Sequence, residues 1–315
     1  MTKNETKVGR WLFAALLALA ISGLTSLCAQ AAPQQAENPK DVTESKSGKA
    51  ANAKGVLVAT PEAGGPARAA KPAPGSGSSS TDWGGGYVGF YTGGAKGGGD
   101  TTTSTVFSPT GYFAASSVPA IAATGVQHPD TLGITGGFQG GYNFQFNNLV
   151  VGFEADFGAY HTAGSKHATT AYPCCAPTGF TVRQTLQSEW LFTARPRLGG
   201  VVHHNTLIYV TGGVAITDST YKGLFTDTFA TAHENAEIDG TLTGWTVGGG
   251  AEFRLQDHLS FKVEYLYLSL GDPGAVTSTN LTAFTPPISF PSNVFTHTAS
   301  GVNGHTVRIG FNHRF

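Results

Sequence analysis

The chain has 315 residues, of which only 12% are charged and 43 are glycine. Average proteins carry roughly 25% charged residues and about 7% glycine. The formal net charge is -1, so no basic surface points to a nucleic-acid partner. The glycines are spread through aromatic and β-branched runs, where they would weaken long helices, and this favours strands.

The first 31 residues have the features of a secretory signal. Lys3, Lys7 and Arg10 precede a largely apolar run over residues 11–27, and a small-residue cleavage site ends at Ala31. This order predicts a signal peptide over residues 1–31 that is removed during export.

Residues 32–81 form a low-complexity tract rich in Ala, Pro, Lys, Gly and Ser. Such a segment cannot bury enough apolar surface to offset the entropy of ordering it. We expect a disordered periplasmic arm, either a plain spacer or a segment that reaches the peptidoglycan.

The remainder, residues 82–315, has the alternating pattern of strands with one apolar and one polar face. No further apolar run approaches the length of about 20 residues that a membrane helix needs, so a membrane would be crossed by strands. Eight strands are predicted near residues 83–93, 132–146, 149–160, 189–203, 207–222, 241–255, 259–270 and 304–315.

The connections between these strands alternate between short and long. Asn147-Asn148, His204-Asn205 and Gln256-Asp257-His258 form short turns, whereas residues 94–131, 161–187, 223–240 and 271–303 read as long polar loops. This is typical of an outer-membrane barrel. The prediction is all-β: an eight-stranded antiparallel up-and-down transmembrane β-barrel with its loops outside and both termini in the periplasm.

One face of the predicted strands carries nearly balanced charge. Balance fits an enclosed interior in which ions pair, and eight strands leave an interior just wide enough for side chains. We therefore expect a structural filling more than a conducting pore. The predicted network consists of Glu154, Asp156, Arg195, Arg197, Glu252, Arg254, Lys262, Glu264 and Arg308.

Several strand motifs resemble one known family. They are Gly136-Gly137-Phe138-Gln139-Gly140-Gly141-Tyr142-Asn143-Phe144-Gln145-Phe146, Val151-Gly152-Phe153-Glu154-Ala155-Asp156-Phe157, Ala194-Arg195-Pro196-Arg197-Leu198-Gly199, Tyr209-Val210-Thr211-Gly212-Gly213-Val214-Ala215, Gly244-Trp245-Thr246-Val247-Gly248-Gly249-Gly250-Ala251-Glu252 and Lys262-Val263-Glu264-Tyr265-Leu266-Tyr267. Together they resemble the Omp25/Omp31-type outer-membrane immunogenic proteins of alphaproteobacteria. The resemblance implies a surface-exposed, porin-like barrel, and some relatives are linked to haem binding or host-cell contact.

The last strand alternates apolar and polar residues and ends on an aromatic residue. Phe311 and Phe315 lie on its apolar face, which resembles the signal read by the outer-membrane barrel assembly machinery. His313 departs from that pattern, because an aromatic residue often stands two positions before the end.

Ten histidines raise the question of haem or metal binding, since imidazole ligates both iron and zinc. His161, His167, His233 and His297 fall in predicted loops without compact ligand spacing, so solvated histidines are the default and no cofactor is expected. Adjacent Cys174 and Cys175 lie in an exposed loop of an oxidising compartment and are predicted to form a disulfide with each other or with another molecule.

No serine elbow or paired metal motif is present, so we do not expect an enzyme. The sequence predicts a surface-exposed outer-membrane barrel with an envelope role and at most a narrow pore. Two alternatives are a small-solute porin and a haem-binding or host-contact protein that acts through its loops.

Overall fold

The computed structural model describes residues 82–203 and 205–315. The predicted signal peptide, 1–31, and the predicted arm, 32–81, lie outside the described residues. The elements are β1 (Gly85–Thr105), α2 (Ser117–Gly125), β2 (Asp130–Phe146), β3 (Leu149–Ala171), β4 (Gly179–Val202), β5 (Thr206–Asp227), β6 (His233–Gln256), β7 (Leu259–Gly271), β8 (Gly274–Ser278), β9 (Thr282–Ala283), β10 (Ile288–Ser289) and β11 (Phe295–Arg314).

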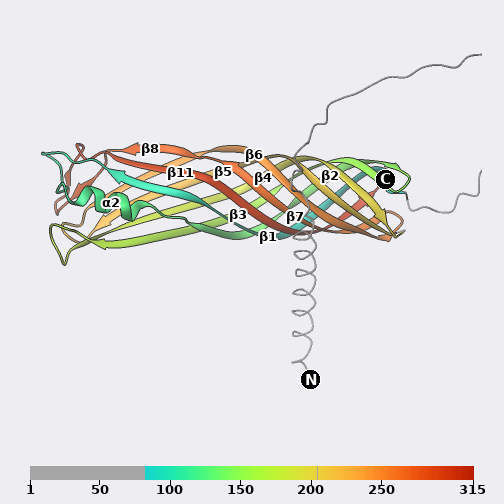
Figure 1. Cartoon of the computed structure of the whole chain (residues 1–315), viewed down its shortest axis with the longest axis horizontal. Helices are drawn as coiled ribbons and strands as arrows, with labels where there is room; N and C mark the ends of the chain where they lie inside the picture. The colour runs from blue at the N-terminus through green and yellow to red at the C-terminus, as the bar shows by residue number, and fades with distance from the viewer. Residues whose placement is uncertain (1–81, 204) are drawn as a thin grey trace, which may run out of the picture. The chain divides into compact units, whose positions relative to one another are not determined.

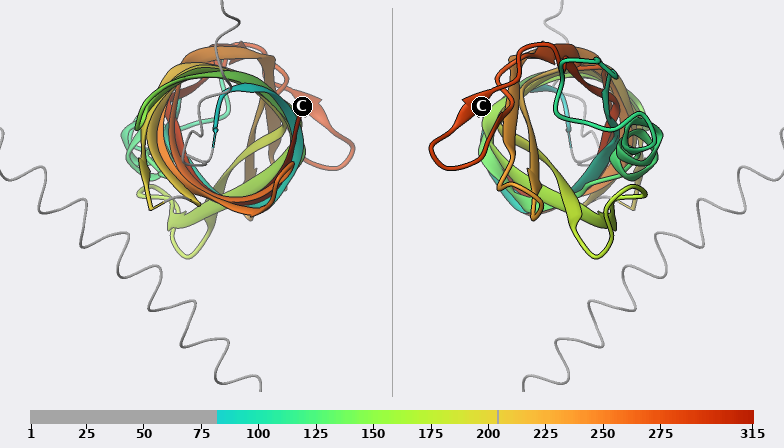
Figure 2. Two further views of the ribbon diagram at one scale, coloured as in Figure 1. Left: turned by 90° about the vertical axis from the view of Figure 1, so that its right-hand side faces the viewer. Right: turned by 90° about the vertical axis from the view of Figure 1, so that its left-hand side faces the viewer.

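Eight of these strands form a closed ring in which every neighbouring pair is antiparallel. Strands β1 to β7 pair in chain order, β7 pairs with β11, and β11 pairs with β1 to close the ring. Strand β8 pairs with the outer part of β11, while β9 and β10 form a small hairpin. Figures 1 and 2 show the resulting long barrel from the side and from both ends. The predicted eight-stranded barrel is confirmed.

The two ends of the barrel differ, and here the predicted loop lengths were wrong. The short turns at Asn147-Asn148 and Gln256-Asp257-His258 lie at the end that carries the C-terminus, whereas α2 lies at the opposite end (Figure 1). There the strands continue through much of the segments predicted as loops: β1 runs to Thr105 and β3 to Ala171. We call the α2 end the outer end and the C-terminal end the inner end.

These strand extensions were mistaken for loops because their outward side chains are polar. Thr101, Thr103 and Thr105 are buried inside the barrel, while Thr102 and Ser104 alternate with them. Threonine is β-branched and favours strands, so a polar run with period-2 burial continues the sheet. Polarity on both faces marks a part of the barrel wall that lies in water.

Most outward apolar side chains of the strands lie in the inner half of the barrel; Leu132 and Ile134 on β2 extend farther out. On β3 they run from Leu149 to Phe157, both exposed, and beyond them the outward positions are polar or small. Aromatic rings border this band at its outer edge, where Phe157 lies 6.1 Å from Trp190 and Trp245 lies 5.5 Å from Tyr267, measured between ring centroids. An apolar band edged by aromatic side chains is the lipid-facing surface of a transmembrane barrel.

Side chains fill the barrel in layers. Apolar clusters occupy the inner mouth, the middle and the outer end, and polar layers separate them. The middle cluster consists of Ala95, Tyr160, Leu191, Ala215, Leu242, Leu268 and Leu270. Among the described residues, no helix has the length and hydropathy to cross a membrane.

Candidate functional site

The most polar layer of the interior is a network of charged side chains on β3, β4, β6, β7 and β11. The structure brings together eight of the nine predicted residues, all at most 2% exposed. Four are cationic and four are anionic, so the layer is neutral as a whole. They are Glu154, Asp156, Arg195, Arg197, Glu252, Lys262, Glu264 and Arg308.

Glu154 and Arg195 are the two hubs of this network. The Glu154 carboxylate lies 2.9 Å from both Arg195 Nη2 and Lys262 Nζ, and 3.5 Å from Arg197 Nη1. Arg195 also lies 2.7 Å from Asp156. Further ion pairs extend the network to its remaining members: Arg195–Glu264, Arg197–Glu252, Lys262–Glu264 and Arg308–Asp156.

Three tyrosines complete the network and were missed from the sequence. Tyr87 donates to Glu154 (2.8 Å) and Tyr209 to Glu264 (2.9 Å), while Tyr91 donates to Asp156 (3.3 Å). The Arg197 guanidinium also lies 4.7 Å from the centre of the Tyr87 ring. The alternation of side chains along β1 could have identified two of them, because Tyr87 and Tyr91 lie on its inward face while Val88 and Phe90 face outward.

The structure does not bring Arg254 into this network, so that part of the prediction was wrong. Arg254 follows Glu252 by two residues on β6 and therefore lies nearer the inner mouth. Its guanidinium lies 5.0 Å from the centre of the Trp83 ring and donates to the backbone carbonyl of Asp82. Arg314 lies at the same distance from this fully buried ring, so Trp83 closes the inner mouth between two guanidinium groups.

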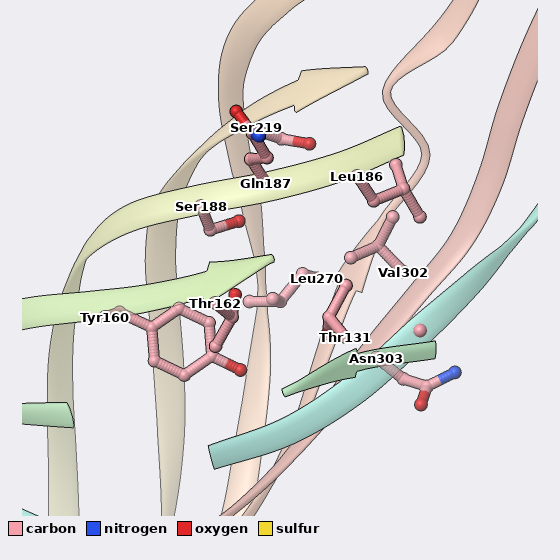
Figure 3. Close-up of a pocket in the computed structure, with 11 residues that line it drawn as sticks. Thr131, Tyr160, Thr162, Leu186, Gln187, Ser188, Ser219, Leu270, Val302 and Asn303 are labelled. Atoms are coloured by element: carbon pink, nitrogen blue, oxygen red, sulfur yellow. The ribbon is translucent and has the colours of Figure 1, made fainter. Parts of the chain in front are cut away.

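A small cavity lies among inward side chains near the middle of the barrel. Its volume is about 10 Å³, roughly the room needed for one water molecule. Figure 3 shows Tyr160, Leu186, Leu270 and Val302 around it. A space of this size holds no substrate, cofactor or sugar.

The outer half of the interior contains a buried hydroxyl–imidazole–carboxylate chain. His297 Nδ1 lies 2.9 Å from Thr103 Oγ1, and His297 Nε2 lies 3.1 Å from a carboxylate oxygen of Glu234. Gln184 donates to the same threonine hydroxyl over 3.0 Å. The order of groups is that of a hydrolase triad, but all are at most 1% exposed, so no substrate reaches them. We interpret these hydrogen-bonded side chains as a structural polar core.

Gly223 provides a test of how tightly this polar core packs. A Cβ at Gly223 would lie 2.4 Å from His297 Nδ1, whereas a Cβ at Gly240 would meet nothing within 4 Å. We expect Gly223→Ala to lower the free energy of unfolding by about 1–3 kcal/mol through overpacking. Urea midpoints of the refolded protein measure the effect, and Gly240→Ala is the matched control. Equal midpoints for the two variants would show that the core yields to the added methyl group.

The four histidines proposed as haem candidates lie in strands, not in loops. His297 on β11 is fully buried with both ring nitrogens in contact with protein groups, so it is not free to ligate iron. His161 and His167 on β3 and His233 at the start of β6 are exposed. His161 and His167 are six residues apart, which places them about 20 Å from one another along the strand. In residues 82–203 and 205–315, no three His, Cys, Asp or Glu side chains form a metal-binding group.

The outer end is closed by a cap of connections that share one carboxylate. Asp227 accepts hydrogen bonds from the hydroxyl groups of Tyr112 (2.5 Å) and Tyr172 (2.9 Å). It also accepts from the backbone N–H groups of Ala230 and Ala232. Burial and the Asp227 carboxylate raise the pKa of Tyr112 and of Tyr172 well above that of a free tyrosine, so both hydroxyls remain donors at neutral pH. Asp227 therefore ties three connections together.

The cap also has its own apolar core, in which Phe113 of the β1–α2 connection packs against Phe225, and Phe225 against Phe295, from the outer ends of β5 and β11. Cys174 and Cys175 form a disulfide between adjacent residues in the β3–β4 connection, and Cys175 packs against that core. The core contains Phe113, Ile121, Tyr172, Phe180, Val182, Phe225, Ala232, Leu281, Ala283 and Phe295.

The aromatic residues of the predicted assembly signal face outward at the inner end of the barrel. The Phe311 ring centroid lies 5.7 Å from that of Phe90 and 5.4 Å from that of Phe261, and Phe315 is 77% exposed. Exposure at this end would leave Phe315 accessible to an assembly factor, and recognition by the assembly machinery remains a prediction.

Comparison with known proteins agrees with this architecture. The chain matches the family model described as an outer membrane protein beta-barrel domain over residues 63–315. It is 34% identical over 184 residues to the 31 kDa outer-membrane immunogenic proteins of Brucella melitensis and Brucella suis, a stretch that covers 58% of this chain and 67% of each relative. This match confirms the resemblance noted from the strand motifs.

Two solved outer-membrane proteins are similar to the chain at low sequence identity. The outer membrane protein OprG from Pseudomonas aeruginosa is 10% identical, with 74% of this chain and 98% of that chain covered and a TM-score of 0.36. Neisserial surface protein A is also 10% identical, with 72% and 97% covered and a TM-score of 0.27.

Proposed function

Because the chain belongs to the outer membrane protein β-barrel domain family, we propose that it is a non-enzymatic, surface-exposed barrel that does not conduct solutes. Its location is the outer membrane, and its role is to carry a folded cap above the membrane. The immunogenic character named for its Brucella relatives fits a protein with exposed outer loops.

The observation that carries the proposal is the filled interior. Trp83 occupies the inner mouth, the charge network spans the next layer, and Leu191 and Leu268 are fully buried in the apolar layer above it. A solute would have to break ion pairs and then displace packed apolar side chains. Both steps are costly, because removing one partner leaves an uncompensated buried charge and because interiors are close-packed.

We further propose that the outer end faces the environment and that the inner end, with its short turns and the C-terminus, faces the periplasm. Short periplasmic turns and longer external connections are usual for bacterial barrels. The predicted arm would then extend into the periplasm, where the peptidoglycan is a candidate partner, and Phe311 and Phe315 would be available to the assembly machinery.

Conductance in planar bilayers tests the proposal. We expect no discrete current steps from the refolded wild-type protein, whose insertion is checked by heat-modifiable gel mobility. A conducting porin refolded by the same procedure serves as the positive control. Lys262 lies inside the barrel, and Lys222 lies on its outer wall. Current steps whose size changes in Lys262→Met but not in Lys222→Met would establish a pore and reject the proposal.

A further inference from the structure

The connections at the outer end have few formal charges: Asp227 ends β5, and Asp272 follows β7. Residues 106–127, 168–182, 228–232 and 273–296 contain no Lys, Arg, Asp or Glu. The polar residues that they carry are mostly Thr, Ser and Asn. External ends of barrels lie in water, where charge would cost nothing, so its absence from these segments requires another explanation.

Large apolar side chains are exposed on these charge-free segments. Three connections supply them: the β1–α2 connection, the β5–β6 connection and the β8–β11 segment. We call the set the tip patch, and its members are Val106 (49% exposed), Phe107 (52%), Phe229 (54%), Phe284 (45%) and Ile288 (54%).

Contacts through Tyr112, Ala283 and Asn293 connect the segments that carry the tip patch. The Tyr112 ring lies 6.3 Å from Phe229 and 6.2 Å from Phe284, measured between ring centroids. Ile288 pairs with Ala283, the residue before Phe284. Asn293 donates to the Val106 carbonyl and accepts from the Tyr112 amide, which links the first connection to the last. An apolar surface of this kind marks an interaction site.

The strand extensions raise the tip patch far above the lipid-facing band. On β4, eleven residues separate Trp190, at the outer aromatic edge, from Gly179 at the start of the strand. With the usual rise of about 3.3 Å per residue and a tilt of about 40°, the strand ends about 28 Å above that edge. The patch is held there by the buried aromatic core and by the Asp227 hydrogen bonds. It is therefore a stiff surface presented away from its own membrane.

We propose that the tip patch docks onto the surface of a second lipid bilayer with neutral, zwitterionic headgroups. Aromatic and aliphatic side chains without neighbouring charge enter the interface of a bilayer at no cost of ion desolvation. The interior void is too small for a ligand, and a second hollow, lined by residues that include Arg183, Lys222 and Glu237, lies on the outer wall between β4, β5 and β6 and contains no member of the tip patch. A protruding patch fits a deformable lipid surface better than it fits a small ligand. That the patch faces outside the cell rests on the proposed orientation.

The test uses the full mature chain in nanodiscs, which expose both ends of the barrel. The probe is a phosphatidylcholine vesicle, and the readout is the fraction of nanodisc-embedded protein that floats with the vesicles. We expect the wild-type protein to float. The triple variant Phe107→Ser/Phe229→Ser/Phe284→Ser should show at least a tenfold loss, whereas Val126→Ser, at an exposed apolar residue beyond the C-terminal end of α2, should behave as wild type.

A second variant guards against misfolding of the triple variant. Ser289→Glu adds a charge beside Ile288 without removing an apolar contact, and it should also reduce flotation. Absence of flotation by the wild-type protein, or flotation only with anionic vesicles, would overturn the proposal. The proposal would also be overturned if nanodiscs that carry the wild-type protein associated with each other and those with the triple variant did not. That result would identify a second copy of the chain as the occupant.

The proposed orientation is checked separately. A Thr110→Cys variant should react with a membrane-impermeant maleimide on intact cells, and an Asp257→Cys variant should not. Reversed labelling would reject the orientation and leave the vesicle result intact. Vesicle failure with correct labelling would reject the docking proposal alone.

Discussion

Replacing Glu154 by glutamine is expected to lower the free energy of unfolding by about 3–5 kcal/mol, the usual cost of breaking a buried ion pair from one side. Glu154 is 1% exposed and lies within 3.5 Å of three cationic groups, those of Arg195, Arg197 and Lys262. The amide leaves the network with one excess positive charge. It also places the N–H donors of the amide opposite ammonium and guanidinium groups, which can only donate hydrogen bonds and cannot accept them.

The urea midpoint of the refolded protein, followed by tryptophan fluorescence, measures this loss. Glu237→Gln is the matched control, since Glu237 pairs with Lys222 over 2.8 Å on the exposed outer wall. Exposed pairs contribute about 0.2–1 kcal/mol, so its midpoint should hardly move. A Glu154→Gln midpoint within error of the control would show that water or ions enter the barrel freely.

The charge of the network can be balanced again by a second substitution. In the Glu154→Gln background, Lys262→Met removes the cation that lies 2.9 Å from the original carboxylate. We expect the double variant to recover part of the lost stability, which a double-mutant cycle would record as a coupling energy between the two sites. Independent, additive losses would mean that the two side chains do not act as a pair.

The eight-stranded ring could be predicted because side-chain alternation depends on strand geometry alone. The run from Leu149 to Ala159 assigns each residue to one face, and the short turns fix which strands are adjacent. The same parity predicted the inward charges, since a cation such as Arg195 can be buried only where anions meet it. Side-chain alternation does not indicate how far along the barrel axis a residue lies. For this reason the prediction placed Arg254 in the charge network, which it does not reach.

The outer half of the molecule could not be predicted by the same reasoning. Its strands have polar outward faces, so the apolar alternation that identified the lower strands ends near Trp190 on β4. The cap depends on contacts between residues far apart in sequence. Tyr112 and Asp227 are 115 residues apart, and no local sequence pattern predicts their hydrogen bond. His297 shows the consequence, because a histidine in a predicted loop is in fact a core residue.

Replacing Asp227 by asparagine is expected to loosen the cap while the barrel remains folded. The amide has one oxygen in place of two, so about half of the four accepted hydrogen bonds are lost and an N–H₂ group faces donors. We expect the local free energy of cap opening to fall by about 2–4 kcal/mol, because each lost bond involves a charged acceptor. Faster hydrogen exchange at the Ala230 and Ala232 amides, and faster proteolysis in the cap, would report the opening.

Asp239→Asn is the control for Asp227→Asn, because the exposed Asp239 accepts one bond, from Thr220, on the outer wall. Heat-modifiable mobility should be unchanged in both variants, since neither side chain belongs to the membrane-spanning layers. Tyr112→Phe should lower the free energy of cap opening less in the Asp227→Asn background than in the wild-type protein, because the asparagine is a poorer acceptor for the Tyr112 hydroxyl. Exchange rates equal to wild type would instead assign the stiffness of the cap to its aromatic core, which packs Phe113 against Phe225 and Phe295 without help from the carboxylate.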